Sequence, residues 1–413
     1  MNYFYLKTFG CKLNQYESQL IRENLIFNGW IEVFVIQNAE YVFVHSCAVT
    51  ANSIKELRKF VHSAKRKKQN LKIVVLGCVV EIYPEELKGL FLFKMFSNKE
   101  KFKIMDSFSD KHVEFFDRIS SFQGHTRSFV KIQDGCDNKC SYCCAWMARG
   151  PSKSRDPENI LEEVKVLLNN GYKEIVLTGL CLGDFGKDID HSLVMLLREI
   201  ESLDFDFRIR LSSIEPQDVG EELITYMKQS QKVVPHVHVS LQSGSDKILK
   251  LMGRRYSVDY FKDMIHRLKG INNFQFSTDI IIGFPEENDK DLQNTMNLLK
   301  DFSPVRVHIF PFSPRPHTRA YGMGGMTASC IIDQSKKEVF DFIKKLIIKN
   351  LKNQIGKTFT VLFEQKTGNY WAGYTENYIR VILKDKEDLK NRFINVDIIG
   401  VDESKCVSIA KIH

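Results

Sequence analysis

The sequence lacks a long apolar run and a recognisable leader. Its longest apolar stretch, at 73–82, is interrupted by turn residues and falls short of the ~18 residues that cross a membrane. The opening MNYFYLKTFGCK has no basic segment followed by an apolar core and a small-residue cleavage site. We therefore expect no contact with a membrane and a cytoplasmic location, where thiols stay reduced.

Neither sign of charge is scarce. The 413 residues include 59 Lys or Arg and 51 Asp or Glu, and 43% of them are apolar. This composition is that of a globular protein with two or three domains, and the net charge of +8 suggests an anionic partner. The stretch KELRKFVHSAKRKK is the most basic, and it is either a solvated helical face or a nucleic-acid patch. Its candidate RNA contacts are Lys65, Arg66, Lys67 and Lys68.

Cysteine is abundant, with ten residues, and four of them fall in the stretch GCDNKCSYCC. Cys136, Cys140 and Cys143 form the pattern C-x-x-x-C-x-x-C. A structural zinc ion needs a fourth ligand, and neither the adjacent Cys144 nor the upstream His125 lies at a standard offset. Three thiolates on a tight loop favour a 4Fe–4S cluster in which one iron is left free to bind a substrate or cosubstrate.

A second group of cysteines is spread over the first 95 residues. The strand-like stretches NYFYLKTFGC, AEYVFVHSC and LKIVVLGC are each followed by a helical stretch, which predicts parallel strands with crossover helices. Cys11, Cys47 and Cys78 then follow carboxyl ends that meet at one edge of the sheet. Either these are three inert buried thiols, or they hold a second cluster. Their repeated placement, twice as Gly-Cys, favours the cluster. The scattered Cys181, Cys330 and Cys406 are expected to be ordinary small apolar residues.

The remaining chain divides into three parts of the α/β class. Residues 96–124 are expected to be a connector with a few strands. Six apolar strands alternate with helices over 125–350, which predicts a closed or partly closed parallel barrel with its functional groups at the strands' carboxyl ends. A lysine-rich helix over about 333–352 leads out. Residues 354–413 predict a small antiparallel β-barrel, in which Tyr374 and Tyr378 either stack on bases or pack in the core.

These motifs together carry a family resemblance. The cysteine loop at the start of a parallel barrel resembles the signature of the radical S-adenosylmethionine (SAM) enzymes. The segments HTRSFVKIQDGCDNKCSYC, TFGCKLNQYES and HSCAVT, and a terminal β domain similar to the RNA-binding TRAM domain, resemble the methylthiotransferases over essentially the whole chain. GCKLNQYE, EIVLTGLCLGDFG, RIRLSSIEP and GYTENYIRV are similar to the MtaB-type branch of that family.

The resemblance implies an activity and its cofactors. It implies a methylthiotransferase domain over 1–95, a radical SAM barrel over 125–350 and a TRAM-like domain over 354–413. Two 4Fe–4S clusters and SAM would add a methylthio group to C2 of N6-threonylcarbamoyladenosine at position 37 of tRNA, beside the anticodon. The expected partners are the tRNA anticodon arm and a reductant such as flavodoxin or ferredoxin, and the enzyme is expected to be a monomer.

The resemblance also implies site residues. Thr178 and Gly179 would meet the methionine end of SAM, while Ser213, Gln242 and Asp279 lie at later strand ends and either contact SAM or substrate or serve as caps and turn formers. Arg149 and Arg155 are candidates for pairing with a carboxylate or phosphate, although Arg155 equally suits the surface. The chain departs from the family pattern at four places, which are His45, Ser240, Glu286 and the segment Cys144-Ala145-Trp146.

Two alternatives remain at this stage. The chain resembles sibling methylthiotransferases that act on isopentenyladenosine in tRNA or on a ribosomal-protein aspartate. An alternative of another class is a non-catalytic RNA-binding protein whose cysteines hold zinc.

Overall fold

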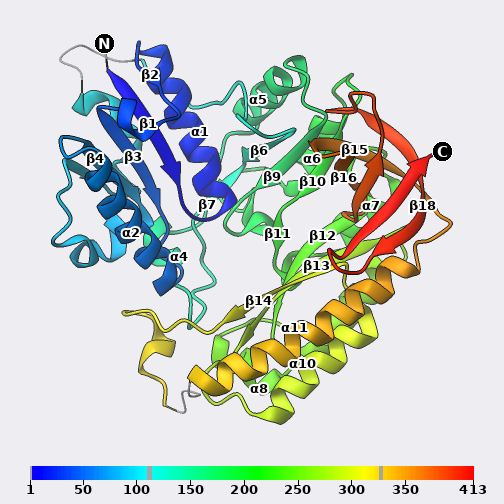
Figure 1. Cartoon of the computed structure of the whole chain (residues 1–413). Coiled ribbons are helices and arrows are strands. Elements are labelled where there is room, and N and C mark those ends of the chain that lie inside the picture. Colours follow the sequence, from blue (N-terminus) through cyan, green and yellow to red (C-terminus); the bar gives the residue numbers. More distant parts are fainter. Residues whose placement is uncertain (1, 109–113, 325–328) are drawn as a thin grey trace.

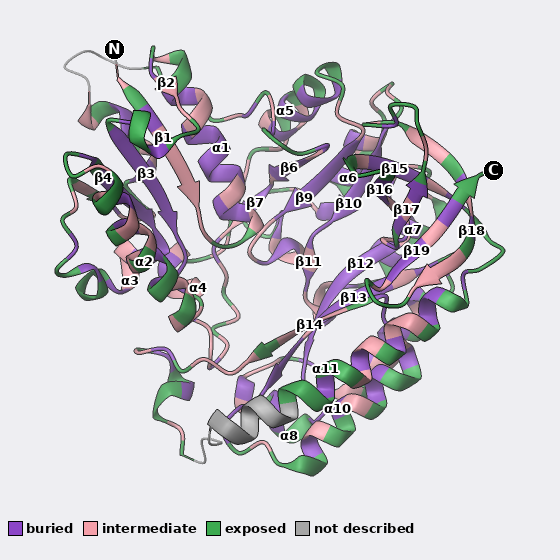
Figure 2. Ribbon diagram, in the orientation of Figure 1, coloured by how far each residue is buried: buried purple, intermediate pink, exposed green. Residues whose placement is uncertain are grey.

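The computed structural model describes residues 2–108, 114–324 and 329–413, and the side chains of 329–335 are not described (Figure 1). An α/β domain, an open parallel barrel and a small closed barrel follow one another along the chain. Within the described ranges, no helix is long and apolar enough to cross a membrane. Buried residues concentrate in the strands of all three parts, whereas the outer helices carry exposed faces (Figure 2).

The first domain is a parallel sheet with the strand order β2-β1-β3-β4-β5. All six residues of its central strand, β3, are buried, as expected for a strand covered on both faces. The predicted strand–helix repeats are confirmed by the strands β1 (Tyr3–Thr8), β2 (Ile31–Glu32), β3 (Tyr41–Ser46), β4 (Lys72–Gly77) and β5 (Lys94–Phe96).

Two long helices cover opposite faces of this sheet (Figure 1). The helix α1 (Lys12–Phe27) packs on the face that carries Phe4 and Phe43, while α2 (Ala51–Lys67) packs on the face that carries Val42 and Val44. The alternation of neighbouring β3 residues between the two cores follows from the two-residue period of a strand.

The connector differs from the prediction in one respect. Its described part contains two short 3-10 helices, at Lys101–Lys103 and Met105–Ser107, and the described residues between Phe96 and Arg127 form no strand. The expectation of further strands there is wrong, because short apolar runs separated by polar residues suit a loop that packs on the α1 side of the sheet as well as they suit strands. Residues 109–113 of the connector lie outside the described residues.

The central barrel consists of two parallel sheets, with the orders β10-β9-β6 and β11-β12-β13-β14. The chain passes from one sheet to the other at Ser212, between β10 and β11, and no pairing between the outer strands β6 and β14 is found in the described part, so the barrel is partly closed. All six predicted strands are present, and one of them, FRIRLSSI, is divided at Ser212 into two strands. The bounds of the resulting seven are β6 (Arg127–Lys131), β9 (Glu174–Thr178), β10 (Arg208–Leu211), β11 (Ser213–Ile214), β12 (His236–Gln242), β13 (Gln275–Ile282) and β14 (Arg306–Pro311).

Helices cover the outside of the barrel (Figure 1). The longer ones are α5 (Pro157–Asn169), α6 (Leu193–Glu201), α7 (Glu221–Gln229), α9 (Val258–Leu268) and α10 (Asp289–Phe302), with the shorter α8 (Asp246–Met252). The short helices α3 (Cys78–Ile82) and α4 (Ala145–Arg149), and the paired strands β7 (Gln133–Asp134) and β8 (Lys153–Ser154), lie next to the cysteines. The exit helix, α11 (Ser329–Lys352), begins a turn earlier than predicted.

The C-terminal domain is a closed five-stranded barrel with the order β15-β16-β17-β19-β18. Its strand pairs are antiparallel, as predicted, except for β17 and β19, which run parallel. The bounds are β15 (Thr358–Thr367), β16 (Tyr370–Thr375), β17 (Arg380–Lys384), β18 (Phe393–Asp402) and β19 (Val407–Ile412).

Candidate active site at the strand ends

The three N-terminal cysteines follow three neighbouring strands. Cys11 is the N-cap of α1 after β1, Cys47 follows β3 directly, and Cys78 begins α3 after β4. The strands pair in parallel with Thr8 beside His45 and with Ser46 beside Gly77, so their carboxyl ends share one edge. The three cysteines are therefore brought to one edge of the sheet, as the sequence predicts, and all three thiols are free.

Glycine before two of these cysteines lets the strand ends approach closely. Gly10 and Gly77 have φ of +111° and +98°, where L side chains are strained. An added Cβ at Gly10 would lie 2.8 Å from the Cβ of Cys47, and one at Gly77 would lie 2.7 Å from the His45 ring. The repeated Gly-Cys pair is thus a requirement of the tight strand–helix turn.

The second set of cysteines occupies the loop between β7 and α4. Each sulfur accepts a hydrogen bond from a nitrogen: Cys136 from the Asn138 backbone at 3.5 Å, Cys140 from the Arg254 guanidinium at 3.3 Å, and Cys143 from the Ala145 backbone at 3.4 Å. Such N–H···S bonds stabilise the thiolates that bind iron–sulfur clusters and tune the potential of the bound cluster.

Hydrogen bonding and burial shift the pKa values of these thiols in opposite directions. A hydrogen bond from Cys181 lowers the pKa of Cys136 to about 7, while burial raises the pKa of Cys143 to about 12. Cys144 points elsewhere: its buried thiol donates to the Ala48 carbonyl at 3.3 Å and joins the core of the N-terminal domain. It therefore joins two domains, which agrees with its exclusion as a ligand.

The spacing of the sulfurs bears on the zinc alternative. Ligands around one tetrahedral zinc ion, with Zn–S bonds of about 2.3 Å, lie about 4 Å from one another. Neither cysteine triad has its three sulfurs within 4.8 Å of one another; the described groups that meet this limit are His238 with Asp279 and His308, and Cys181 with Asp184 and Asp218. Three free thiols that lie farther apart than the ligands of a single ion, beside N–H donors or strand ends, fit the larger 4Fe–4S cluster better.

A buried carboxylate joins the N-terminal domain to the cysteine loop. Glu17 of α1 is fully buried and pairs with Lys101 at 2.7 Å, Arg149 at 3.1 Å and Lys131 at 3.2 Å. Burial alone would raise the pKa of Glu17, but Arg149, followed by the two lysines, holds it well below its usual value. The network connects α1, the connector, β6 and the helix after the cysteine loop, and so fixes the two cysteine sets relative to each other.

Both arginines predicted beside the loop bind carboxylates of the chain itself. Arg149 is buried and also bonds Asp134 at 2.9 Å and the Asn14 side chain at 2.7 Å. Arg155 pairs with the buried Glu163, so the surface alternative for Arg155 is wrong. The unusual His45 lies in the same region, where burial lowers its pKa to about 3 and keeps the ring neutral.

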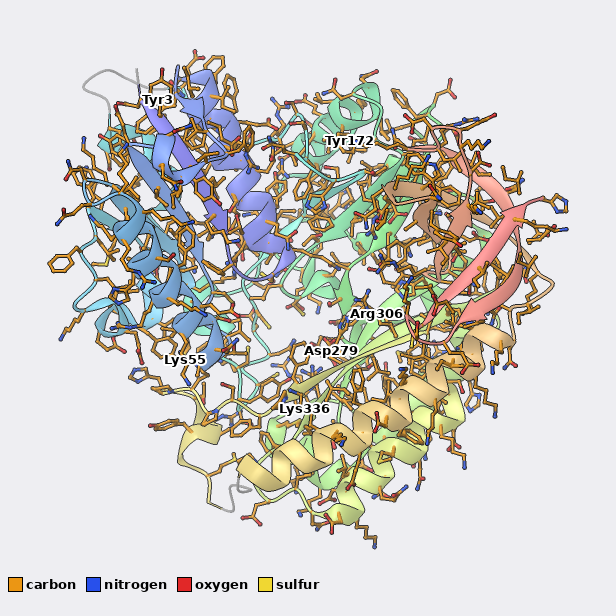
Figure 3. All side chains as sticks on the ribbon, in the orientation of Figure 1. Tyr3, Lys55, Tyr172, Asp279, Arg306 and Lys336 are labelled. Atoms are coloured by element: carbon orange, nitrogen blue, oxygen red, sulfur yellow. The ribbon has the colours of Figure 1, made fainter. Side chains whose placement is uncertain are left out.

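A cavity of about 500 Å³ lies between the three domains. Its lining includes six residues that the sequence predicted for the site, which are Cys11, Thr178, Gly179, Ser213, Asp279 and Tyr378. Gln242 is buried at a strand bulge, with φ of +66°, and does not line this cavity. The structure thus brings together groups from the N-terminal domain, the barrel strands and the C-terminal domain around one space (Figure 3).

Several cavity residues were not singled out from the sequence. Two histidines flank Asp279: His238 at 3.0 Å and His308 at 2.9 Å. Burial would raise the pKa of Asp279, but the hydrogen bonds from both imidazoles lower it below its ordinary value. The other basic residues that line the cavity and were not predicted are Lys12, Arg127, Arg210, His236 and Arg306.

The C-terminal domain is docked onto the barrel through buried charges. Glu174 of β9 pairs with Arg208, with Arg210 at 2.7 Å and with Arg127 at 3.7 Å. The same arginines donate to C-terminal carbonyls, for example Arg208 to Tyr374 at 2.9 Å. These bonds hold the domain against the cavity.

Of the two tyrosines of the C-terminal domain that are predicted to stack on bases, one lines the cavity and the other does not. Tyr378 lines the cavity and its ring lies 4.6 Å from the His236 ring. Tyr374 does not line the cavity; it stacks on Tyr378 at 4.9 Å and lies under the Arg127 guanidinium at 4.8 Å. The geometry therefore offers Tyr378 to a ligand in the cavity, and base contact by Tyr374 stays a prediction.

The predicted basic patch lies away from the cysteines. Because α2 runs antiparallel to the strands, it begins near Cys47 and ends at the opposite edge of the sheet, where the Lys68 ammonium donates to the Ala39 carbonyl. Lys65 likewise donates to the Leu71 carbonyl at 2.8 Å. RNA contact by 65–68 stays a prediction, and it would involve RNA at a distance from the reacting base.

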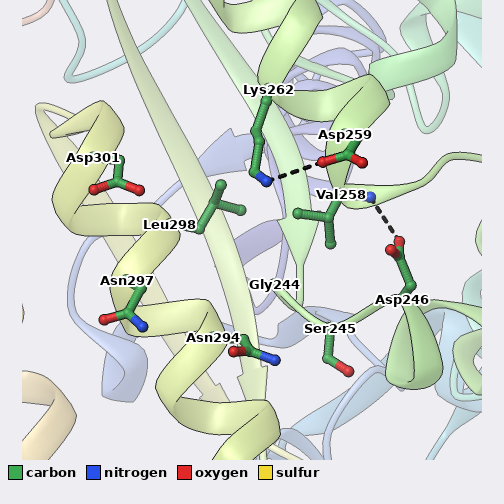
Figure 4. Close-up of a pocket in the computed structure, with 10 residues that line it drawn as sticks. All are labelled: Gly244, Ser245, Asp246, Val258, Asp259, Lys262, Asn294, Asn297, Leu298 and Asp301. Carbon is green, nitrogen blue, oxygen red and sulfur yellow. Dashed lines mark hydrogen bonds and ion pairs between the residues drawn. The ribbon is translucent and has the colours of Figure 1, made fainter.

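A second cavity, of about 300 Å³, lies on the outside of the barrel between the α8–α9 region and α10 (Figure 4). It is lined mainly by polar and charged side chains, among them Asp259 paired with Lys262. It contains no cysteine and none of the predicted site residues.

Comparisons with known proteins agree with this geometry. The family described as "Radical SAM superfamily" matches residues 130–299, and "Uncharacterized protein family UPF0004" matches residues 3–95. A structure of the radical S-adenosylmethionine methyltransferase TsrM from Kitasatospora setae has a TM-score of 0.58, covering 78% of this chain and 77% of that one at 12% identity, which shows the fold alone.

Two curated relatives match nearly the full length. The threonylcarbamoyladenosine tRNA methylthiotransferase MtaB of Thermotoga maritima is 39% identical over 91% of this chain and 90% of its own. The protein of the same name from Chlamydia pneumoniae is 36% identical over 92% of this chain and 90% of its own. The resemblance seen in the sequence is confirmed: the chain belongs to the MtaB family of radical SAM tRNA methylthiotransferases.

Proposed function

We propose that the protein adds a methylthio group to C2 of N6-threonylcarbamoyladenosine at position 37 of tRNA. The observation that carries the proposal is that two sets of three free cysteines lie at the carboxyl edges of two parallel sheets that are joined by the Glu17 network. Between the domains lies a cavity large enough for a modified nucleoside, and one of the cysteines, Cys11, lines it. The choice of threonylcarbamoyladenosine as the substrate nucleoside rests on the two relatives, which are threonylcarbamoyladenosine tRNA methylthiotransferases.

The cysteines divide into two groups with separate tasks. Cys136, Cys140 and Cys143 would hold one 4Fe–4S cluster, and Cys11, Cys47 and Cys78 would hold the second. When bound, these groups supply the one-electron cleavage of SAM, which permits removal of hydrogen from an unactivated carbon, and the sulfur to be inserted. A second SAM molecule would supply the methyl group.

The chain's own residues bind and orient the reactants. Thr178, the last residue of β9, and Gly179, which follows it, line the cavity and are suited to contact SAM; Ser213 and Asp279 extend that wall. The paired imidazoles hold Asp279 ionised and fix its orientation. Tyr378 offers an aromatic edge or face to the base.

Recognition of tRNA would use surfaces outside the cavity as well. The TRAM-like barrel and the basic end of α2 would contact the anticodon arm, whose unpaired loop lets a base be splayed toward the site. The reductant would be a flavodoxin- or ferredoxin-like protein, and the enzyme would act as a monomer in the cytoplasm.

The test is mass spectrometry of tRNA nucleosides from cells with and without this gene. Loss of the methylthio form of threonylcarbamoyladenosine, with accumulation of its precursor, is the expected result. Loss of methylthio-isopentenyladenosine instead would contradict the choice of nucleoside but not the chemistry. No change in any tRNA nucleoside would contradict the proposal and would direct attention to the ribosomal-protein aspartate.

A further inference from the structure

The cavity between the domains carries more positive than negative charge. Its lining includes Lys12, Arg127, Arg210 and Arg306, but only one carboxylate, Asp279. That carboxylate is engaged by two histidines. Any of these cations that is not paired with a carboxylate behind the cavity wall has to be balanced by solvent or by a ligand.

Two of the four cations are paired with carboxylates that lie behind the cavity wall. Arg210 pairs with Glu174 at 2.7 Å, and Arg127 pairs with Glu364 at 2.5 Å as well as with Glu174. They are held by the docking of the C-terminal domain and are poorly placed to bind a further anion.

Lys12 and Arg306 are different, because the side chain of neither forms a hydrogen bond or ion pair with any residue in the described part of the chain. Lys12 is the first residue of α1, directly after Cys11, and its side chain is half-buried. Arg306 begins β14 in the barrel and lies near Asp279 (Figure 3). Two domains thus each contribute one uncompensated cation to the same cavity.

The charge of the cavity lining suits one substituent of the tRNA adenosine, threonylcarbamoyl, better than another, isopentenyl. Six of its residues are apolar, namely Leu13, Phe129, Val176, Leu180, Leu211 and Phe310, and most of the others are polar or charged. An isopentenyl chain would leave Lys12 unpaired in a partly desolvated position, which is unfavourable, whereas the exposed Arg306 keeps its contact with solvent. A threonylcarbamoyl group ends in a carboxylate, which would form a charge-assisted hydrogen bond to an ammonium.

We propose that Lys12, assisted by Arg306, binds the carboxylate of the substituent on the substrate adenosine and thereby selects tRNA that carries it. The inference rests on the proposed function and names a residue that sets its specificity. An RNA phosphate and the carboxylate of SAM present the same oxyanion chemistry, so the test separates these sources.

The experiment measures the binding of anticodon stem-loops to the full chain without SAM, by fluorescence anisotropy at one fixed salt concentration. Four loops differ only at position 37: adenosine, threonylcarbamoyladenosine, glycinylcarbamoyladenosine and isopentenyladenosine. The glycinyl loop keeps the carboxylate and lacks the threonine side chain.

The wild type is expected to bind both carboxylate-bearing loops about 10-fold or more tightly than the adenosine loop, as for a charge-assisted hydrogen bond. Lys12→Met is expected to remove this preference for the carboxylate-bearing loops and to leave the affinity for the adenosine loop unchanged. Lys12→Arg is expected to retain most of the preference, and Arg306→Met to reduce it in part. The control, Lys165→Met on the exposed face of α5, binds all loops like the wild type.

Other results would overturn the inference. If Lys12→Met lowers the affinity for all four loops equally, Lys12 contacts a backbone phosphate. If Lys12→Met leaves the preference for the carboxylate-bearing loops unchanged, Lys12 does not bind the carboxylate. The wild-type protein could bind all four loops equally while cells that carry its gene still make the methylthio form of threonylcarbamoyladenosine. This pair of results would refute the carboxylate subsite and leave the proposed function standing. Preference for the isopentenyl loop would contradict both.

Discussion

The buried carboxylate of Glu17 provides the sharpest test of how the two domains are joined. Glu17→Gln keeps the size of the side chain and removes its charge, while Lys101, Lys131 and Arg149 remain. Arg149 and Lys131 keep Asp134 as a partner, but among the described residues Lys101 keeps no carboxylate and bonds the Asn98 amide oxygen at 3.1 Å. Breaking a buried ion pair from one side costs about 3–5 kcal/mol, so we expect a loss of that size in the free energy of unfolding.

The pH dependence of this loss has a definite sign. The folded-state pKa of Glu17 lies well below the ordinary value of about 4.5, because Arg149 and the two lysines outweigh the effect of burial. The stabilisation is therefore present above the unfolded pKa and is lost as the pH falls through the folded one. The difference between wild type and Glu17→Gln is expected to be largest near neutral pH and to shrink below about pH 4.

Hydrogen exchange measured by mass spectrometry reports the local free energy of opening for peptides from β3 and β6, which lie on either side of the junction. The double variant Glu17→Gln with Lys101→Met is expected to recover part of the loss, because it removes the cation left unpaired. The matched control, Glu221→Gln, breaks an exposed pair with Arg267 and should change stability by less than about 1 kcal/mol. A loss below about 1 kcal/mol for Glu17→Gln itself would refute the reasoning.

Three further predictions concern the cysteines and the turn after β13. Cys78→Ala should lower the iron content of reconstituted protein from about eight to about four atoms per chain, while the core variant Cys144→Ala keeps about eight; equal iron in both would contradict the second cluster. Glu286 has φ of +67°, so Glu286→Gly should raise the stability by up to about 1 kcal/mol in thermal unfolding, and a lower midpoint would contradict that. Burial raises the pKa of Glu287 to about 7, so the wild type should lose stability as the pH rises from about 4.5 to about 7. Glu287→Gln should lack this slope, which denaturant titrations at several pH values would show; the same slope in both proteins would count against the assignment.

The sequence predicted the architecture because its signals are local and periodic. Apolar strands followed by amphipathic helices imply parallel sheets, and parallel sheets bring Cys11, Cys47 and Cys78 to one edge although more than thirty residues separate each from the next. The same logic placed the cysteine loop at the carboxyl end of the first barrel strand.

The charged lining of the cavity was missed because it depends on contacts between distant segments. The alternation HVHVS of β12 points His236 and His238 to one face, and this two-residue period was an available signal that the strand has a polar inner face. No local pattern, however, pairs Glu17 with Arg149 across 132 residues, or docks Arg210 on the C-terminal carbonyls. The parallel pairing of β17 with β19 has the same origin, because it arises when the barrel closes.

Methylthiolation of threonylcarbamoyladenosine is measured with the purified protein, reconstituted with iron and sulfide and supplied with SAM and a reductant. Two tRNA anticodon arms are offered, one with threonylcarbamoyladenosine at position 37 and one with isopentenyladenosine, and their nucleosides are analysed by mass spectrometry. We expect a methylthio product from the threonylcarbamoyl arm and none, or far less, from the isopentenyl arm. Methylthiolation of the isopentenyl arm alone, or of neither arm by protein that holds its full iron content, would contradict this expectation.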